Sequence, residues 1–209
     1  MCGALLSLSA LALADEFGPR DWATEKAACA LNHSKSNAGE DLLLLPSLLY
    51  DVWRRAGSTG RSFVELGMDV PIEGRNTYMV GACFGWHGVL VEGHPAHVAA
   101  LNASSRMRRA VGLHSAVCNS TQGVRTLQFS LDGSSSAGVL ADLSPKKQHA
   151  RRRRTVAVPC QRLDSLMVAG GLRRGATLLS LDVEGGEHTV LSASNPELFR
   201  IVMVEMLSS

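Results

Sequence analysis

The sequence predicts an α/β domain with a mostly parallel sheet and helices on both of its faces. Three observations support this prediction. Short apolar runs that are typical of strands alternate with segments of helical spacing, over short connections. Several of these runs end in an acid or a glycine, as strands do where a sheet binds a ligand. The length of 209 residues and the hydrophobic content of 45% suit one globular domain. We expect an N-terminal segment over residues 1–40 and the domain over residues 41–209.

The first elements follow from apolar runs and their breaks. The apolar stretch 41–55 predicts a helix with a kink or a new start at Pro46. A short β-type run predicts the first strand over 63–66. Residues 76–84 have helical spacing, and a glycine-containing turn leads from them to a second strand over 89–92.

The middle of the chain is less regular. A helix is predicted over 96–104 and a third strand over 112–118. The Gly/Ser-rich and basic stretch 119–154 predicts a β-hairpin or excursion with a mobile loop. Residues 155–160 read as an edge strand, because Pro159 cannot donate a hydrogen bond within a central strand.

The last elements return to a regular alternation. Residues 162–169 and 187–194 have helical spacing, and residues 178–182 and 201–205 are apolar runs typical of buried strands. Ligands bind such sheets at the carboxyl ends of the strands, so the polar residues at the strand ends are the candidates for function.

Charge and cysteine content limit the classes of function. The net charge is +2, and the basic run 146–154 has no interleaved aromatic residues, so we expect no nucleic-acid partner. The five cysteines are odd in number and lack a CxxC pair, so we predict neither a metal site nor a disulfide framework. Cys83 and Cys118 have apolar neighbours and are interpreted as small buried hydrophobic residues.

The N-terminus leaves the compartment open between the cytoplasm and the secretory pathway. Residues 4–14 form an apolar run that ends in Ala-Leu-Ala, as a secretory signal does, but no Lys or Arg precedes it. The alternative is a fragment of an amphipathic helix. The run is too short to span a bilayer, so no stable membrane span is expected. Asn-x-Ser/Thr tripeptides at Asn32, Asn102 and Asn119 favour secretion.

Acidic residues at the strand ends define a candidate cleft. Glu92 follows an apolar strand and suits the two hydroxyls of a ribose, whereas Glu65 and Gly67 suit the wall and floor of a cofactor cleft. Asp182 and Glu184 are two residues apart on an extended segment, so they point the same way.

Other polar residues near these ends have simpler explanations. Glu187 is interpreted as a first-turn residue that complements a helix dipole. His114 and His188 are interpreted as structural or surface histidines, and His94 is a weaker candidate for contacting a ligand. No GxGxxG, Walker, GxSxG or HExxH motif is present, which disfavours a nicotinamide-dependent enzyme. The residues alone predict an α/β domain with an adenosine-type cleft.

Five stretches together resemble the FkbM family of S-adenosylmethionine-dependent methyltransferases. The resemblance extends over roughly residues 51–205, with a divergent patch within it. The stretches are FVELGMDVPIEGRNTYMVGACFGWHGVLVEGHP, HSAVC, VPCQRLDSLM, LLSLDVEGGEHTVL and IVMVE. The resemblance implies a Rossmann-like methyltransferase fold with S-adenosylmethionine as the cofactor. It also implies methyl transfer to an oxygen of a small molecule or a glycan.

The resemblance also implies roles for the residues of the cofactor motifs. Glu65 and Gly67 fall on the first motif, in which Asp69 keeps a polar group. Glu92 falls on the acid that holds the ribose hydroxyls. The segment near the adenine corresponds to Ser115, Ala116 and Val117.

The DVEG segment falls where the family places the methyl-transfer centre. Because an acceptor oxygen must lose its proton as it attacks the methyl group, a carboxylate within hydrogen-bond reach can take that proton. Asp182 is the first candidate for this role and Glu184 the second.

Two departures from the family pattern support an alternative function. Pro71 stands where the first motif usually has a glycine, and proline restricts the close approach of the backbone to a cofactor. The fold normally has two strands beyond the one predicted over 201–205, so the sheet is expected to lack its last C-terminal strands. The alternative is a catalytically inactive, methyltransferase-like binding or interaction domain.

Overall fold

The computed structural model describes most of the chain. It describes residues 20–36, 39–48, 61–67, 76–107, 109–119, 125–131, 138–143, 145, 148, 154–183 and 185–204. The chain forms two compact units, one of Met1–Arg61 with Ile72–Trp86 and one of Ser62–Pro71 with His87–Ser209. Several sequence predictions lie outside the described residues: those on the N-terminal run 4–14, Asp69, Pro71, Glu184 and most of the basic run 146–154.

The first unit is helical in its described part. It contains α2 (Arg20–His33), α3 (Glu40–Leu43) and α5 (Tyr78–Phe84), and α2 packs against α5. The helix predicted over 41–55 corresponds to α3 and to helical residues 45–48, and its remainder lies outside the described residues.

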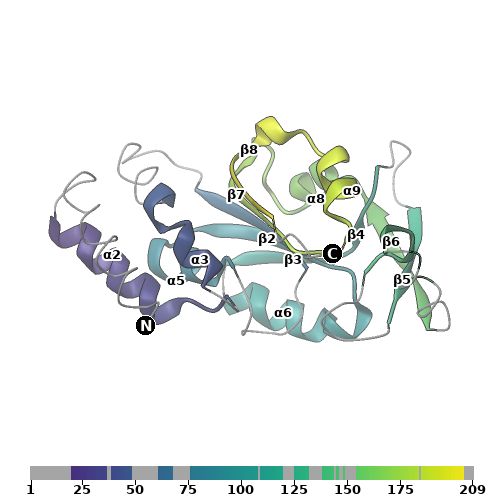
Figure 1. The fold of residues 1–209 in the computed structure, drawn as a ribbon, viewed down its shortest axis with the longest axis horizontal. Helices are drawn as coiled ribbons and strands as arrows, with labels where there is room; N and C mark the ends of the chain where they lie inside the picture. The colour runs from purple at the N-terminus through teal and green to yellow at the C-terminus, as the bar shows by residue number, and fades with distance from the viewer. Residues whose placement is uncertain are drawn as a thin grey trace. The chain divides into compact units, whose positions relative to one another are not determined.

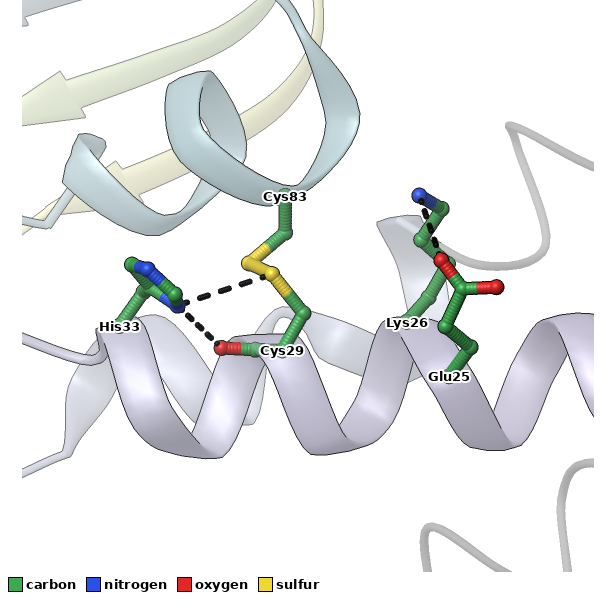
Figure 2. The surroundings of a disulfide bond; sticks show 5 residues. All are labelled: Glu25, Lys26, Cys29, His33 and Cys83. Carbon is green, nitrogen blue, oxygen red and sulfur yellow. Dashed lines mark hydrogen bonds and ion pairs between the residues drawn. A yellow bond between two sulfur atoms is a disulfide. The ribbon is translucent and has the colours of Figure 1, made fainter.

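A disulfide joins α2 and α5 within this unit. Cys29 of α2 is bonded to Cys83 of α5, 54 residues later in the sequence (Figure 2). On the same face of α2, His33 Nδ1 lies 2.9 Å from the carbonyl oxygen of Cys29. The prediction of no disulfides is therefore wrong. Cys83 is buried as expected, but as half of a disulfide.

The second unit is organised around a five-stranded parallel sheet. Its strands in spatial order are β3 (Ala110–His114), β2 (His87–Glu92), β1 (Ser62–Leu66), β7 (Ala176–Leu181) and β8 (Phe199–Val204). The chain adds β2 and β3 on one side of β1 and then returns to add β7 and β8 on the other. The order therefore reverses between β1 and β7, and a ligand crevice is expected at the carboxyl ends there.

Helices cover both faces of this sheet. Figure 1 shows α8 (Leu163–Ala169) and α9 (Glu187–Ser192) on one side of it and α6 (Val98–Met107) on the other. Buried side chains of the strands pack on α8 and α9 in one core cluster, to which β1 contributes Val64 and Leu66. The predicted α/β class and the mostly parallel sheet are thus confirmed.

A second, three-stranded sheet interrupts the alternation. Its order is β4 (Ala116–Val117), β6 (Thr155–Gln161) and β5 (Arg125–Ser130), with β5 antiparallel to β6. The strand predicted over 112–118 is therefore two strands, β3 and β4, which belong to different sheets. A disulfide between Cys118 and Cys160 joins the end of β4 to β6, which again corrects the prediction for the cysteines.

Pro159 lies in a central strand, contrary to the prediction of an edge strand. Its carbonyl oxygen accepts a 3.1 Å hydrogen bond from Ser115 Oγ, on the side where β4 lies. Because the N and the C=O of one residue face the same side of a strand, the missing N–H also faces β4. β4 pairs only with the two residues that follow Pro159, so no backbone partner needs that N–H.

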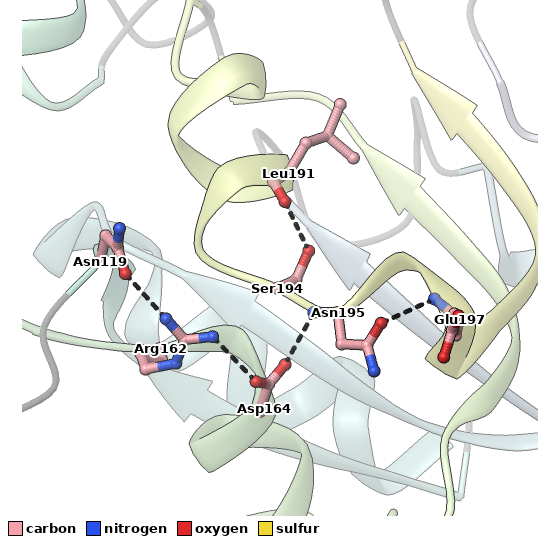
Figure 3. A network of polar contacts seen from close by, with 7 residues as sticks. All are labelled: Asn119, Arg162, Asp164, Leu191, Ser194, Asn195 and Glu197. Atoms are coloured by element: carbon pink, nitrogen blue, oxygen red, sulfur yellow. Dashed lines mark hydrogen bonds and ion pairs between the residues drawn. The ribbon is translucent and has the colours of Figure 1, made fainter.

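A polar network fixes the start of α8. Arg162 donates to Asn119 Oδ1 at 2.7 Å and to Asp164 Oδ2 at 3.1 Å (Figure 3). Asp164 Oδ1 in turn accepts from the backbone N–H of Asn195, before the short helix η3 (Pro196–Leu198). These contacts join the end of β4 to the segment that leads into β8.

Among the described residues, no helix is long and apolar enough to cross a membrane.

Candidate functional site

A cleft opens in the second unit at the carboxyl ends of β1, β2 and β7. It lies beside the point where the strand order reverses, as expected for a sheet of this class. Its cavity volume is about 60 Å³, more than the roughly 10–15 Å³ that one water molecule needs. It is lined by Leu66, Gly67, Val91, Glu92, Gly93, Ser115, Ala116, Val117, Phe129, Val139, Asp142, Asp182, Val183, Gly186 and Val190.

Gly67 forms the floor where β1 ends. Its N–H donates to the carbonyl oxygen of Val91 at 3.1 Å, and its φ of +83° lies in the left-handed region. A Cβ built on this residue would overlap the carbonyl oxygen of Asp182. Glycine is therefore needed twice over, for the backbone conformation and for the close approach of the segment after β7.

Glu92 ends β2 and is 5% exposed. A buried carboxylate needs hydrogen-bond donors, and Glu92 Oε1 accepts from the backbone N–H of His94. The Nδ1 atom of His97 lies 4.0 Å from the same oxygen. His94, a weaker candidate for ligand contact, does not line the cleft. Its side chain instead accepts from the backbone N–H of Ala96 at the start of η1 (Pro95–His97).

Residues 115–117 form one wall where β3 gives way to β4. The backbone N–H of Ser115 donates to the carbonyl oxygen of Glu92 at 3.0 Å, so this wall is fixed to the end of β2. Ala116 and Val117 are 5% and 6% exposed, and the next residue, Cys118, forms the disulfide with Cys160. The small and apolar surface of this wall suits a flat ring system better than a charged group.

Phe129 extends the apolar wall and comes from the second sheet. A Cβ on Gly93 would lie 2.5 Å from the Phe129 ring, so the glycine makes room for it. The ring also packs edge-on against His94, with 6.1 Å between the centroids. Val139 pairs with Phe129 in an isolated antiparallel β-bridge and lines the same cleft. Neither residue was predicted, because both lie in the stretch that the sequence assigns only to an excursion.

Asp142 is a carboxylate of the cleft that the sequence did not single out. It ends the short helix η2 (Leu140–Asp142), and its Oδ1 accepts a 2.9 Å hydrogen bond from Thr189 Oγ1 of α9. Burial raises the pKa of the Asp142 carboxyl above its usual 3.8, the hydrogen bond from Thr189 lowers it, and the negative charge of Glu187 raises it.

Asp182 lies directly after β7, at the carboxyl end of the strand, as the sequence predicts. Its backbone N–H donates to the carbonyl oxygen of Leu66 at 3.1 Å, which continues the pairing of β7 with β1. Glu187 supports the following turn, since its Oε1 accepts from the N–H groups of Val183 and Gly185 at 3.3 and 3.1 Å. The first-turn position expected for Glu187 is confirmed.

The structure brings five of the predicted site residues to one cleft: Gly67, Glu92, Ala116, Val117 and Asp182. Glu65 does not line it. Its neighbours Val64 and Leu66 face the core of α8 and α9, and side chains alternate along a strand, so Glu65 points to the opposite face. Asp69 and Glu184 lie outside the described residues.

A comparison with protein-family models bears on the chemistry of this cleft. The model described as "Methyltransferase FkbM domain" matches residues 65–209, more than half of the chain. The match covers all of the cleft-lining residues. No curated protein and no solved structure matches the chain.

Proposed function

The chain belongs to the FkbM methyltransferase family, and we propose that its cleft binds S-adenosylmethionine and directs methyl transfer to an oxygen of a small-molecule or sugar acceptor. One observation carries the proposal. A buried carboxylate, an apolar wall and a second carboxylate line one cleft at the point where the strand order reverses: Glu92, Ala116 with Val117, and Asp182. This is the combination that an adenosine and a reactive centre beside it require.

The residues of the cleft fit the adenosine part of the cofactor. The carboxylate of Glu92 is an acceptor only, with two oxygens, and so it suits a pair of ribose hydroxyls. Ala116, Val117 and Phe129 offer an apolar surface to the adenine. The lack of a side chain at Gly67 lets the Asp182 carbonyl approach the backbone at the end of β1, and this close approach keeps the Asp182 segment beside the adenosine part of the cleft.

The chemistry divides between the cofactor and the protein. When bound, S-adenosylmethionine supplies a methyl group on a positively charged sulfur. The protein has to hold the acceptor oxygen in line and provide a place for its proton. Asp182 lines the cleft after β7 and is the first candidate for this role, with Glu184 the second.

Isothermal titration with S-adenosylmethionine tests the proposal directly. We expect binding by the folded protein, and Glu92→Ala should weaken it at least tenfold, because hydrogen bonds to a charged group contribute about 1.5–3 kcal/mol. Glu197→Ala is the matched control, since Glu197 is exposed and lies outside the cleft.

The alternative function makes the opposite prediction. A catalytically inactive, methyltransferase-like domain can be folded and still not bind the cofactor. If circular dichroism shows folded wild-type protein and titration shows no heat of binding, the proposed function is wrong. If the cofactor binds but Glu92→Ala binds as well as the wild type, the ribose assignment alone fails.

A further inference from the structure

We propose that Asp142 is the residue that takes the proton from the acceptor hydroxyl, with Thr189 as the positioning residue that holds its carboxylate. This inference rests on the proposed function, and it names a catalytic group from a part of the chain that no motif of the sequence marks. Asp142 thereby takes the role of proton acceptor in place of Asp182, and Asp182 holds the acceptor in line for the transfer.

The position of Asp142 is the first argument. Asp142 lines the same cleft as Asp182, although the two are 40 positions apart in the sequence. The loop before α9 faces it closely, since a Cβ built on Gly186 would lie 3.3 Å from Asp142 Oδ2. Gly186 also lines the cleft, so its missing side chain leaves Oδ2 accessible from that side.

The two carboxylate oxygens of Asp142 have different surroundings. Oδ1 accepts the 2.9 Å hydrogen bond from Thr189 Oγ1, which fixes the plane of the carboxylate. Within the described ranges, no hydrogen bond to Oδ2 is found. A general base needs this arrangement, because one oxygen is held by the protein and the other is left for the substrate proton.

The electrostatic environment favours proton acceptance. Burial and the charge of Glu187 raise the pKa of Asp142, so its ionised form is a stronger base than an ordinary aspartate. Among the described residues, Glu187 of α9 is the charged group that shifts the pKa of Asp142. Asp182, at the end of β7, lines the same cleft but is not among the causes of that shift. The hydroxyl of Thr189 acts in the opposite sense and lowers the pKa.

The step balances without a further reactant. The acceptor oxygen forms a bond to the methyl carbon as the carbon–sulfur bond breaks, and the electron pair of that bond stays on sulfur. The O–H bond of the acceptor breaks, and its proton passes to Asp142 Oδ2. A neutral methyl ether, a neutral thioether and a protonated Asp142 result.

The first test uses the protein without an acceptor. Carboxyl ¹³C NMR titration should show Asp142 with a raised pKa, which Thr189→Val raises further and Glu187→Gln lowers. Thr189→Ser keeps the hydroxyl and should restore the wild-type titration. In the Glu187→Gln variant, the side-chain amide oxygen can still accept from the two backbone N–H groups. If neither change moves the titration of Asp142, the arrangement proposed for its carboxylate is overturned.

The second test measures binding and turnover separately. Asp142→Asn should bind S-adenosylmethionine with a Kd within threefold of the wild type, by isothermal titration. With methyl-labelled S-adenosylmethionine and a panel of neutral monosaccharides and glycerol, its kcat should fall by roughly 10²- to 10⁴-fold. Glu197→Gln, the same kind of change at an exposed position, should leave kcat unchanged.

The pH profile separates Asp142 from Asp182. In the pH profile of kcat, the acid limb should move to higher pH with Thr189→Val and to lower pH with Glu187→Gln. Asp182→Asn should lower kcat and leave the acid limb in place. A kcat of Asp142→Asn within threefold of the wild type overturns the inference. Wild-type protein that binds the cofactor but methylates no hydroxyl of the panel also overturns it, whereas a wild type that does not bind the cofactor refutes the proposed function itself.

Discussion

The hydroxyl of Thr189 donates a 2.9 Å hydrogen bond to Asp142, and this contact joins two segments that are 47 residues apart. Thr189 lies on α9, within the stretch LLSLDVEGGEHTVL that resembles the family. Asp142 lies between β5 and β6, in a part of the chain that none of the five resembling stretches covers. The irregular stretch between β5 and β6 is thereby connected to the helix that follows the DVEG segment.

The cost of burying Asp142 predicts an unusual effect of removing its charge. The folded state raises the pKa of Asp142 above 3.8, so between 3.8 and the raised value the folded state binds more protons than the unfolded state. The contribution of Asp142 to stability therefore falls as pH rises through that window, and its ionised form opposes folding above it.

Asp142→Asn removes this charge and keeps an oxygen for Thr189. We expect the variant to be at least as stable as the wild type at pH 7 and to lose this advantage below pH 3.8. Thermal unfolding of the ligand-free protein from pH 3 to pH 8 measures the difference. A variant that is less stable than the wild type at pH 7 contradicts the raised pKa. Glu197→Gln serves as the exposed control.

Gly67 should tolerate no side chain. Gly67→Ala places a Cβ against the carbonyl oxygen of Asp182 and forces alanine into a left-handed conformation, so we expect a loss of about 2 kcal/mol or more. Gly171→Ala is the matched control, because Gly171 has a φ of +89° but no atom within 4 Å of a built Cβ. Gly171→Ala should lower the free energy of unfolding by about 1–2 kcal/mol, which is the cost of the left-handed backbone conformation alone.

Denaturant unfolding of both glycine variants separates the two causes. Equal losses at the two positions would show that the close approach of the Asp182 segment to Gly67 contributes nothing. The folded fraction of Gly67→Ala should also bind S-adenosylmethionine more weakly, since the cleft floor has to shift to make room.

The two disulfides predict that the chain reaches its native state in an oxidising compartment. Structural disulfides persist in secreted proteins and are rare in the cytosol. Cys118 and Cys160 are buried and 42 residues apart, so removing their bond by a double Ser substitution should cost about 4 kcal/mol in the chain-entropy account.

Peptide mapping under non-reducing conditions checks both pairs. We expect Cys29 linked to Cys83 and Cys118 linked to Cys160, and a lower Tm in the presence of a dithiol reductant. Protein with four free thiols at these positions and an unchanged Tm would refute the oxidising compartment. The Cys29→Ser, Cys83→Ser variant provides the comparison, because that bond lies in the other compact unit.

The strands of the main sheet were predictable because their signal is local. Apolar runs with acids and glycines at their ends mark β1, β2 and β7, and the same ends place Gly67, Glu92 and Asp182 at the cleft. Glu65 shows the limit of this reasoning. It belongs to the same motif as Gly67, but the alternation of side chains along β1 turns it to the other face of the sheet.

Features that depend on distant contacts were not predictable. The bond of Cys118 to Cys160 requires β4 and β6 to be neighbours, and the spacing of the cysteines carries no information about that pairing. Likewise, Pro159 is tolerated in a central strand only because β4 is two residues long. Asp142 and Phe129 enter the cleft from the irregular stretch, and only the tertiary fold shows that they do.

Phe129 offers a test of which part of the cleft holds the adenine. Its ring lines the cleft and is 7% exposed, and aromatic side chains stack on nucleobases with about 1–3 kcal/mol per base. Phe129→Leu keeps an apolar side chain in the second sheet and removes the ring. We therefore expect it to weaken S-adenosylmethionine binding by roughly tenfold, measured by isothermal titration.

Val156→Ala is the matched control for this change. Val156 pairs with Phe129 across β5 and β6 and packs against the same small core, but it does not line the cleft. A general loosening of the second sheet would weaken binding in both variants, whereas loss of a direct contact weakens it only in Phe129→Leu. If Phe129→Leu binds the cofactor like the wild type, the adenine does not stack on Phe129. Ala116 and Val117 alone would then provide the apolar contact to the adenine.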